Sequence, residues 1–376
     1  MSAIRRLATE LKHLPGWRAQ GRYVAFAVDD YGSVRLSSRE ARDHLEASIP
    51  GFGGQMDCYD AVETCEDLEA LFEVLRGVRD SDDRAAVFTA YALPANPDFQ
   101  HMREVHAYAY ESLTQTFRRL SAEQPRAYEG TWELWQEGMR EGLIRPQCHG
   151  REHFSVPLLE RKLRQRDQDL EANLRVESMA GLADSPEMPG VGFTHAFGLH
   201  DLSLLDNQRE IIADGFRLFN EIFGFSSSTF TPPALKLHSS LDEYVASLGV
   251  KSIAKPFSGR QPAGNGKMRR SVNFLTPPRK GRVGKVVRTL SFEPCSGNKA
   301  DPVGQALREI EAAFRWKKPA IISSHRVNYA GHIDPENRKR GLSQLEQLLC
   351  GIRKNWPDVR FVTVDELVDI MESGGR

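Results

Sequence analysis

The sequence lacks any apolar run long enough to cross a membrane. A transmembrane helix needs about 20 consecutive apolar residues, and no run of even about 18 occurs in the 376 residues. The first residues, 1–13, carry charges where a secretory signal peptide needs its apolar segment. We therefore expect no membrane insertion and no export, and a cytoplasmic location.

Cysteine is scarce and scattered. The chain has five cysteines, an odd number, and none of them forms a C-x-x-C pair. This usage argues against a disulfide framework and against a thiolate zinc knuckle.

The sequence also lacks an excess of charge of either sign. Its 50 basic and 51 acidic residues give a formal charge of −1, so we expect no nucleic-acid partner and no general attraction to anionic membranes. Two segments deviate locally: residues 29–83 carry fifteen acids and five bases, and residues 258–288 carry nine bases and no acid. The basic segment is rich in Gly and Pro, which predicts a loop insertion or a hairpin. It is either a solvated basic face or a clamp for a phosphate or carboxylate of the substrate.

Short β-branched or aromatic runs alternate with longer segments of helical period. The strand-like runs cover residues 22–28, 85–91, 143–148, 227–231, 250–254, 320–323 and 359–363. This rhythm predicts an α/β fold with a parallel sheet of about seven strands. Because no internal repeat or low-complexity tract interrupts it, we expect one elaborated domain over residues 1–376.

Several helices have readable ends. The apolar stripe of residues 342–355 predicts a helix, and another is expected at 211–223, before Gly224. Thr363 and Glu366 form a capping box for a last helix at 364–371. Ser240 and Glu243 repeat that pattern before residues 244–248.

Polar residues follow several of the predicted strands. Asp29 and Asp30 end the first strand, His149 follows the third, Thr231 ends the fourth, and His325 follows the run at 320–323. In a parallel barrel the carboxyl ends of the strands open onto one face, where active sites are built. We therefore expect these segments to converge.

The Asp29-Asp30 pair requires compensation, since two adjacent carboxylates at the end of a buried strand repel each other. A cation bound by one of them would supply it and leave the other as a general base. Alternatively, one carboxylate caps a helix and the other faces water.

Three histidines complete the candidate site. His149 and His153 have the i, i+4 spacing that lets two imidazoles hold one ion, although eleven histidines also allow such a pair by chance. A carboxylate from another strand end would make this a three-ligand site with an open position for water. His325 is a candidate general acid or a hydrogen-bonded rim residue.

Taken in order, these elements resemble the polysaccharide deacetylases, also called the NodB-homology group or carbohydrate esterase family four. The segment Phe26-Ala-Val-Asp29-Asp30-Tyr-Gly32 resembles the first motif of the family, His149 and His153 its second, and Ile321-Ile-Ser-Ser-His325 its last. The resemblance spans residues 20–370 and implies a distorted (β/α) barrel of seven strands with long loop insertions. It also implies that Asp29 is the base, Asp30, His149 and His153 are the metal ligands, and His325 is the acid.

The third motif of the family departs from the pattern. Thr231 and Ala234 stand where the family has an arginine that orients the base and an aromatic residue. Arg151 and Arg326, each beside a motif histidine, are candidates to replace that arginine. The backbone N–H of Ala234 is a candidate oxyanion donor.

Other positions are less defined. Ser323 stands where the family has a leucine that lines the acetyl pocket, and no Asp-Trp segment matches the fourth motif, which leaves the tuning of His325 without an explanation. Tyr31 and Asn328 are candidate substrate contacts.

The resemblance implies a metal-dependent hydrolase that removes an acetyl or other acyl group from an N- or O-acylated carbohydrate or glycan precursor. The ion is expected to be Zn²⁺, with Co²⁺, Ni²⁺ and Mn²⁺ as alternatives. The basic segment adds an anionic or phosphate-linked sugar as a substrate hypothesis. The acyl sugar, the native metal and the oligomeric state stay open.

Two rival interpretations remain. His149-Gly-Arg-Glu152-His153 satisfies the H-x-x-E-H signature of inverzincin metallopeptidases, but that motif needs a continuous helix, and Gly150 and Pro157 argue against one. The second rival is a catalytically impaired carbohydrate-binding protein that retains the deacetylase fold.

Overall fold

The computed structural model describes residues 15–264, 267–297 and 301–374. The charged N-terminal segment on which the expectation about a signal peptide rests, residues 1–13, lies outside these ranges. Among the described residues, no helix is both long enough and apolar enough to span a membrane.

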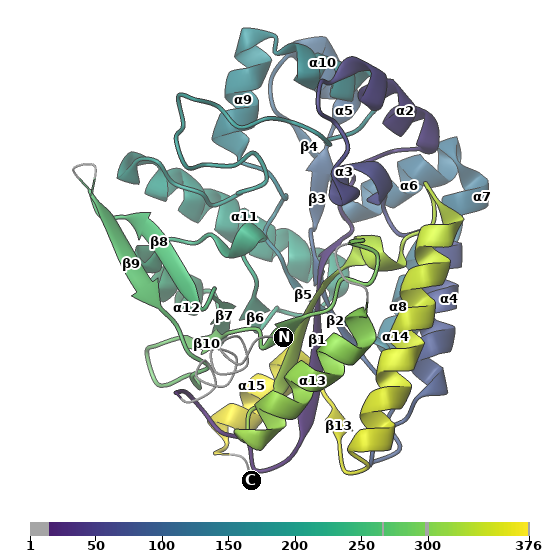
Figure 1. Cartoon of the computed structure of the whole chain (residues 1–376). Coiled ribbons are helices and arrows are strands. Elements are labelled where there is room, and N and C mark those ends of the chain that lie inside the picture. The colour runs from purple at the N-terminus through teal and green to yellow at the C-terminus, as the bar shows by residue number, and fades with distance from the viewer. Residues whose placement is uncertain (1–14, 265–266, 298–300, 375–376) are drawn as a thin grey trace.

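A parallel β sheet forms the centre of the molecule (Figure 1). Its strands run in the order β10-β7-β6-β5-β2-β1-β12-β11, and β13 pairs with the start of β1. Every pairing in this sheet is parallel. Within the described residues the edge strands β10 and β11 do not pair with each other, so the sheet is an open half-barrel. The predicted α/β fold of barrel type is confirmed.

The strands of this sheet include all seven that the sequence predicts. They are β1 (Tyr23–Tyr31), β2 (Phe88–Ala92), β5 (Ile144–Cys148), β6 (Thr229–Phe230), β7 (Ser252–Ala254), β10 (Gly284–Val286), β11 (Leu290–Ser291), β12 (Ala320–His325) and β13 (Arg360–Phe361). Two antiparallel hairpins lie outside it: β3 (Ala95–Pro97) with β4 (Tyr110–Ser112), and β8 (Ser258–Pro262) with β9 (Met268–Val272).

The basic segment 258–288 is only partly the expected insertion. Its first part is the β8–β9 hairpin, at the left of Figure 1. Its later part contains β10, which pairs in register with β7 and so belongs to the main sheet. The prediction of a loop is wrong there. The strand β10 has only three residues, Gly284–Val286, and is too short to show a strand pattern in a sequence rich in Gly and Pro.

Helices cover the sheet and follow most of its strands. They are α2 (Arg39–Ser48), α3 (Gln55–Tyr59), α4 (Cys65–Gly77), α5 (Phe99–Val105), α6 (Leu113–Glu123), α7 (Pro125–Tyr128), α8 (Thr131–Arg140), α9 (Val156–Gln165), α10 (Gln168–Arg175), α11 (Leu205–Phe223), α12 (Asp242–Ser247), α13 (Pro302–Arg315), α14 (Pro335–Asn355) and α15 (Val364–Glu372). Single 3₁₀ turns occur at Leu202–Leu204, Pro233–Leu235, Ser239–Leu241 and Arg326–Tyr329.

The predicted helix ends hold where the signal is local. Thr363 and Glu366 form the capping box of α15, and Gly224, with a φ of 74°, ends α11. The prediction that Ser240 caps a helix is wrong. The His238 ring accepts a hydrogen bond from the Ser240 backbone N–H and begins a 3₁₀ turn, so α12 starts only at Asp242.

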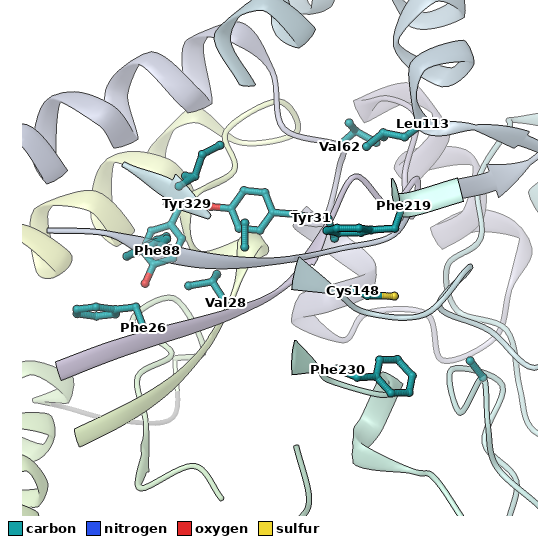
Figure 2. Packing of buried hydrophobic residues seen from close by; sticks show 14 of the residues in the cluster. Phe26, Val28, Tyr31, Val62, Phe88, Leu113, Cys148, Phe219, Phe230 and Tyr329 are labelled. Carbon is teal, nitrogen blue, oxygen red and sulfur yellow. The ribbon is translucent and has the colours of Figure 1, made fainter. Parts of the chain in front are cut away.

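The core lies on both faces of β1, all nine residues of which are buried. Phe26 packs against Phe88 with ring centroids 5.3 Å apart, and Phe88 packs against Tyr329 at 5.4 Å (Figure 2). Large apolar side chains on a strand that is covered on both sides give the near-continuous hydrophobic run of a parallel sheet. This packing fixes the strand whose carboxyl end carries Asp29 and Asp30.

Candidate active site

The end of β1 is irregular in a way that exposes its carboxylates to a cavity. The pairing of β1 with β2 shifts register between Val28 and Tyr31, as at a β-bulge, and Asp30 has a φ of 75°. A positive φ is uncommon for a residue with a Cβ and marks a constrained position. Asp29 and Asp30 both line a cavity of about 660 Å³ at this end of the sheet.

Asp30 meets the histidine pair. Its Oδ1 lies 3.3 Å from His149 Nε2 and 3.0 Å from His153 Nε2, and the three donor atoms lie within 4.8 Å of one another. His149 Nδ1 lies 2.6 Å from the carbonyl oxygen of Thr231, which orients its other ring nitrogen toward Asp30. Metal-binding histidines are commonly held in this way.

These residues fit a divalent ion. Two imidazole nitrogens and one carboxylate oxygen form a common catalytic zinc set, and the cavity leaves room for a further ligand. Burial raises the pKa of Asp30, but His153 and His149 outweigh it and hold that pKa well below its usual range. The carboxylate is therefore ionised and available as a ligand.

Asp29 is held by Arg288. The Arg288 guanidinium donates to both carboxylate oxygens of Asp29, at 2.5 and 2.6 Å, and also to Ser323 Oγ at 2.7 Å. Burial raises the pKa of Asp29, but the charge of Arg288 outweighs it and the pKa is lowered. Arg288 thus makes the contact to Asp29 that the resemblance assigns to the arginine of the third motif, and Ser323 helps to hold it.

His325 lies beside Asp29 at the cavity, with its Nε2 3.9 Å from Asp29 Oδ2. Its other ring nitrogen, Nδ1, lies 2.8 Å from Glu293 Oε1. Burial lowers the pKa of His325, but the hydrogen bond and charge of Glu293 outweigh it and raise the pKa to about 10. The imidazole is therefore protonated at neutral pH.

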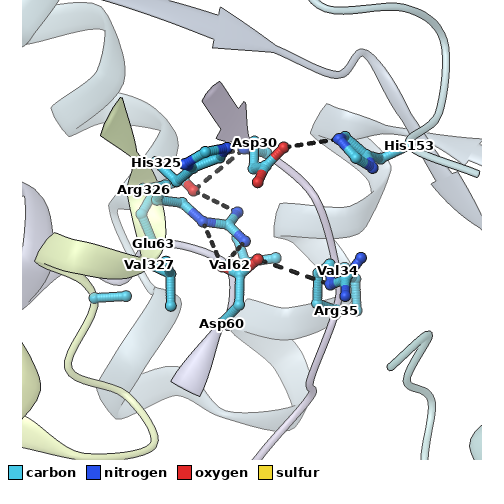
Figure 3. Close-up of polar contacts among 12 residues, drawn as sticks. Asp30, Val34, Arg35, Asp60, Val62, Glu63, His153, His325, Arg326 and Val327 are labelled. Carbon is cyan, nitrogen blue, oxygen red and sulfur yellow. Dashed lines mark hydrogen bonds and ion pairs between the residues drawn. The ribbon is translucent and has the colours of Figure 1, made fainter. Parts of the chain in front are cut away.

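Arg326 does not replace the missing arginine. Its side chain is 2% exposed and donates to Asp60 at 2.6 Å and to Glu63 at 3.0 Å (Figure 3). Glu63 also accepts hydrogen bonds from the Gly32 backbone N–H and from Trp135 Nε1. This buried network joins the turn after β1 to the 3₁₀ turn after β12. It continues through Asp60, 3.9 Å from Arg35 at the cavity, but among the described residues Arg326 makes no contact with Asp29.

Arg151 is also engaged elsewhere. It donates twice to Glu152, at 2.6 and 2.9 Å, and once to Asp214 at 2.9 Å. The segment from His149 to Ser155 is not helical, and Gly150 has a φ of 118°. The inverzincin interpretation is therefore not favoured, because it needs a helix and a free Glu152.

The remaining candidates divide between the cavity and the core. Tyr31 packs edge-on against Trp135 and is 1% exposed, and Asn328 is fully buried and donates to Glu293. Both are buried, and neither is among the residues that line the cavity in the described part of the chain. Thr231 is also buried and acts through its backbone carbonyl on His149.

Ala234 does line the cavity. It has a φ of 52°, and its backbone N–H has no hydrogen-bond acceptor in the part of the chain that the structure describes. An N–H in that state remains a candidate oxyanion donor.

The sequence did not indicate Arg288 or Glu293. They flank β11, a strand of two residues. Arg288 is the last residue of the basic segment and Glu293 follows it, and neither has a motif around it. The sequence indicated only what is missing. Because Thr231 replaces the arginine of the third motif and no segment matches the fourth motif, other residues have to hold Asp29 and His325.

Solved structures of polysaccharide deacetylases match this chain. One named as a polysaccharide deacetylase from Mycobacterium smegmatis has 12% identity and a TM-score of 0.48, with 96% of each chain covered. Another, from Pseudomonas aeruginosa PAO1, has 9% identity and a TM-score of 0.45, covering 92% of this chain and 89% of that one. A 4-alpha-glucanotransferase from Thermococcus litoralis has 8% identity and a TM-score of 0.45, covering 93% of this chain and 40% of that one.

The sequence matches no protein-family model and no curated protein. Because unrelated activities can share one fold, function has to be argued from the side chains in the cavity.

Proposed function

We propose that the protein is a metal-dependent hydrolase that removes an acetyl or other acyl group from an N- or O-acylated carbohydrate. The observation that carries the proposal is the meeting of two units at one cavity. One is the Asp30, His149 and His153 cluster, and the other is Asp29 opposite His325. Acyl hydrolysis needs a base for the attacking water, an acid for the leaving group and a stabiliser for the oxyanion.

Asp30, His149 and His153 would hold the ion. A bound Zn²⁺ would polarise the acyl oxygen and lower the pKa of an adjacent water toward neutrality. The residues of the chain do the rest. Thr231 fixes the His149 ring through its carbonyl, and the strained backbone at Asp30 directs its carboxylate toward both imidazoles.

Asp29 accepts the proton of the attacking water. Arg288 keeps it ionised and fixes both of its oxygens, which orients the free lone pairs into the cavity. The Ala234 N–H donates to the developing oxyanion from the facing wall.

His325 protonates the departing amine or sugar hydroxyl. Glu293 binds its Nδ1, so that the Nε2–H points to Asp29 and the cavity. Base and acid are separate groups on neighbouring strands, β1 and β12, paired in register at Asp29 and His325.

The test is an acetate-release assay on N- and O-acetylated sugars with zinc-loaded protein, combined with metal analysis. We expect Asp29→Asn to abolish acetate release while zinc remains near one per chain, because Asp29 is not part of the ligand cluster. Asp43→Asn, at an exposed position on α2, is the matched control and should retain activity. Full activity in Asp29→Asn would refute the assignment.

A further inference from the structure

A second cavity adjoins the one that holds the candidate active site. It measures about 630 Å³, and Ala234 and Leu235 line both cavities. The two residues have φ values of 52° and 54°, so the chain makes a tight turn there. A substrate that places its acyl group at His325 can therefore extend past this turn into the second cavity.

The second cavity has a strongly cationic wall. Its lining residues include one acid, Asp242, and six bases: Lys236, Lys255, Arg260, Arg269, Arg270 and Lys285. Asp242 is already engaged, since it accepts a hydrogen bond from Lys255 Nζ at 2.6 Å. Within the described residues, the other five cations have no carboxylate partner.

The polar contact of Lys285 is with a neutral group. Within the described residues its Nζ donates to the amide oxygen of Asn273, at 3.0 Å, and to no carboxylate. Uncompensated cations that converge on a cavity are what binds an oxyanion.

The hairpin presents its arginines on two faces. Arg260 lies directly opposite Arg270, and Gln261 directly opposite Arg269. Side chains of directly opposed residues share one face of a hairpin, and successive side chains alternate between the two faces. Gln261 donates to and accepts from Ser239 in the cavity wall. Arg269 is therefore on the face turned to the cavity, whereas Arg260 and Arg270 are on the other face.

The floor of the cavity carries a further close pair of cations. Lys255 follows β7, and Lys285 is in the neighbouring β10, where the Lys255 N–H donates to the Val286 carbonyl. Burial lowers the pKa of Lys255 below its usual value, the charge and hydrogen bond of Asp242 oppose this, and the charge of Lys285 adds to the lowering. A bound anion would relieve this repulsion.

We propose that the second cavity binds a phosphate group of the substrate, so that the enzyme acts on a phosphate-bearing acyl sugar. The inference rests on the proposed function for the identity of the reacting group, but the anion site itself rests only on the cations described above. A phosphate carries more charge than a sugar carboxylate and therefore gains more from several lysines and arginines.

The first test measures binding of inorganic phosphate by calorimetric titration of the zinc-loaded protein. The variant is Lys236→Ala combined with Arg269→Ala, since both side chains are exposed and their removal leaves no buried group unpaired. The control is Arg279→Ala combined with Lys280→Ala, which removes the same charge from exposed positions that line neither cavity. We expect the variant to bind phosphate about tenfold or more weakly, and the control to bind within about twofold of the original protein. Equal affinities in all three would overturn the proposal.

The second test compares substrates. It uses an N-acetylhexosamine, its 1-phosphate, its nucleoside diphosphate conjugate and an acetylated uronic acid. We expect one of the two phosphate-bearing sugars to have the highest kcat/KM, and which of them it is distinguishes a sugar phosphate from a nucleotide sugar. The variant should reduce the preference for phosphate-bearing over neutral sugar about tenfold.

The two tests separate the two proposals. A preference for the neutral sugar or the uronic acid would overturn the phosphate subsite while leaving the hydrolase intact. No acetate release from any of the four would instead count against the proposed function, and the titration with inorganic phosphate would still decide the subsite.

Discussion

Arg288 binds Asp29 through two hydrogen bonds, although the two residues lie 259 positions apart in the sequence. Each Arg288 nitrogen meets a different carboxylate oxygen, at 2.6 and 2.5 Å, which is the bidentate geometry that fixes a carboxylate in both position and rotation. The guanidinium also reaches Ser323 on β12. The candidate base is therefore held from the connection between β10 and β11, which no sequence motif marks.

Arg288→Lys should separate charge from geometry. Lysine keeps the positive charge but cannot form the two parallel hydrogen bonds. We expect kcat for acetate release to fall about 100-fold, because a misplaced base loses its orientation, while zinc content stays unchanged. Lys280→Ala, in the same basic segment and exposed, should leave kcat unaltered. A kcat for Arg288→Lys equal to that of the original protein would contradict the role of Arg288.

Glu293→Gln should move the alkaline limb of the pH profile. Glu293 raises the pKa of His325 to about 10, so the acid stays protonated through neutral pH and is lost only as pH rises through that value. Glutamine can still accept the Nδ1–H hydrogen bond but lacks the charge, so the pKa of His325 should fall by about 1–3 units. We expect the alkaline limb of kcat/KM to shift to lower pH by that amount. Glu346→Gln, exposed on α14, should not shift it, and an unmoved limb in Glu293→Gln would argue against His325 as the acid.

His153→Ala should lose the metal. Of the two histidines, His153 is the more accessible, with its side chain 14% exposed against 1% for His149, so its removal should disturb folding less. We expect zinc to fall from about one per chain to a small fraction of that value, measured by elemental analysis after dialysis. His44→Ala, at an exposed position on α2, is the control. Full zinc occupancy in His153→Ala would remove that residue from the ligand set.

Arg326→Met should destabilise the fold rather than alter the chemistry directly. It leaves Asp60 and Glu63 buried without their cation, for which we expect a loss of about 3–5 kcal/mol in the free energy of unfolding, measured by urea denaturation. The exposed pair Arg22 and Asp358 gives the comparison, since Arg22→Ala should cost at most about 1 kcal/mol. Equal losses in both variants would mean that the buried network contributes no special stability.

The sequence predicted those parts of the molecule that are marked by local patterns. Asp29, Asp30, His149 and His325 are each next to a strand whose apolar run is readable, and parallel pairing then brings the strand ends together. The capping box at Thr363 is likewise contained in four residues.

The rest depends on contacts that no local pattern contains. Glu293 acts on His325 from a strand too short to show a period. The prediction that Arg151 or Arg326 orients the base rested on their positions in the sequence, each close to a motif histidine. Both side chains are instead bound to nearer carboxylates, Glu152 and Asp60.

The residues that hold Asp29 and His325 belong to one short segment of the chain. Arg288 and Glu293 lie five positions apart in the sequence, on either side of β11, which is an edge strand of the open half-barrel. Inserting or deleting a single residue between them would therefore misalign the candidate base, Asp29, and the candidate acid, His325, at once. Natural length variation in this protein should therefore stop at residue 288 and resume only after residue 293.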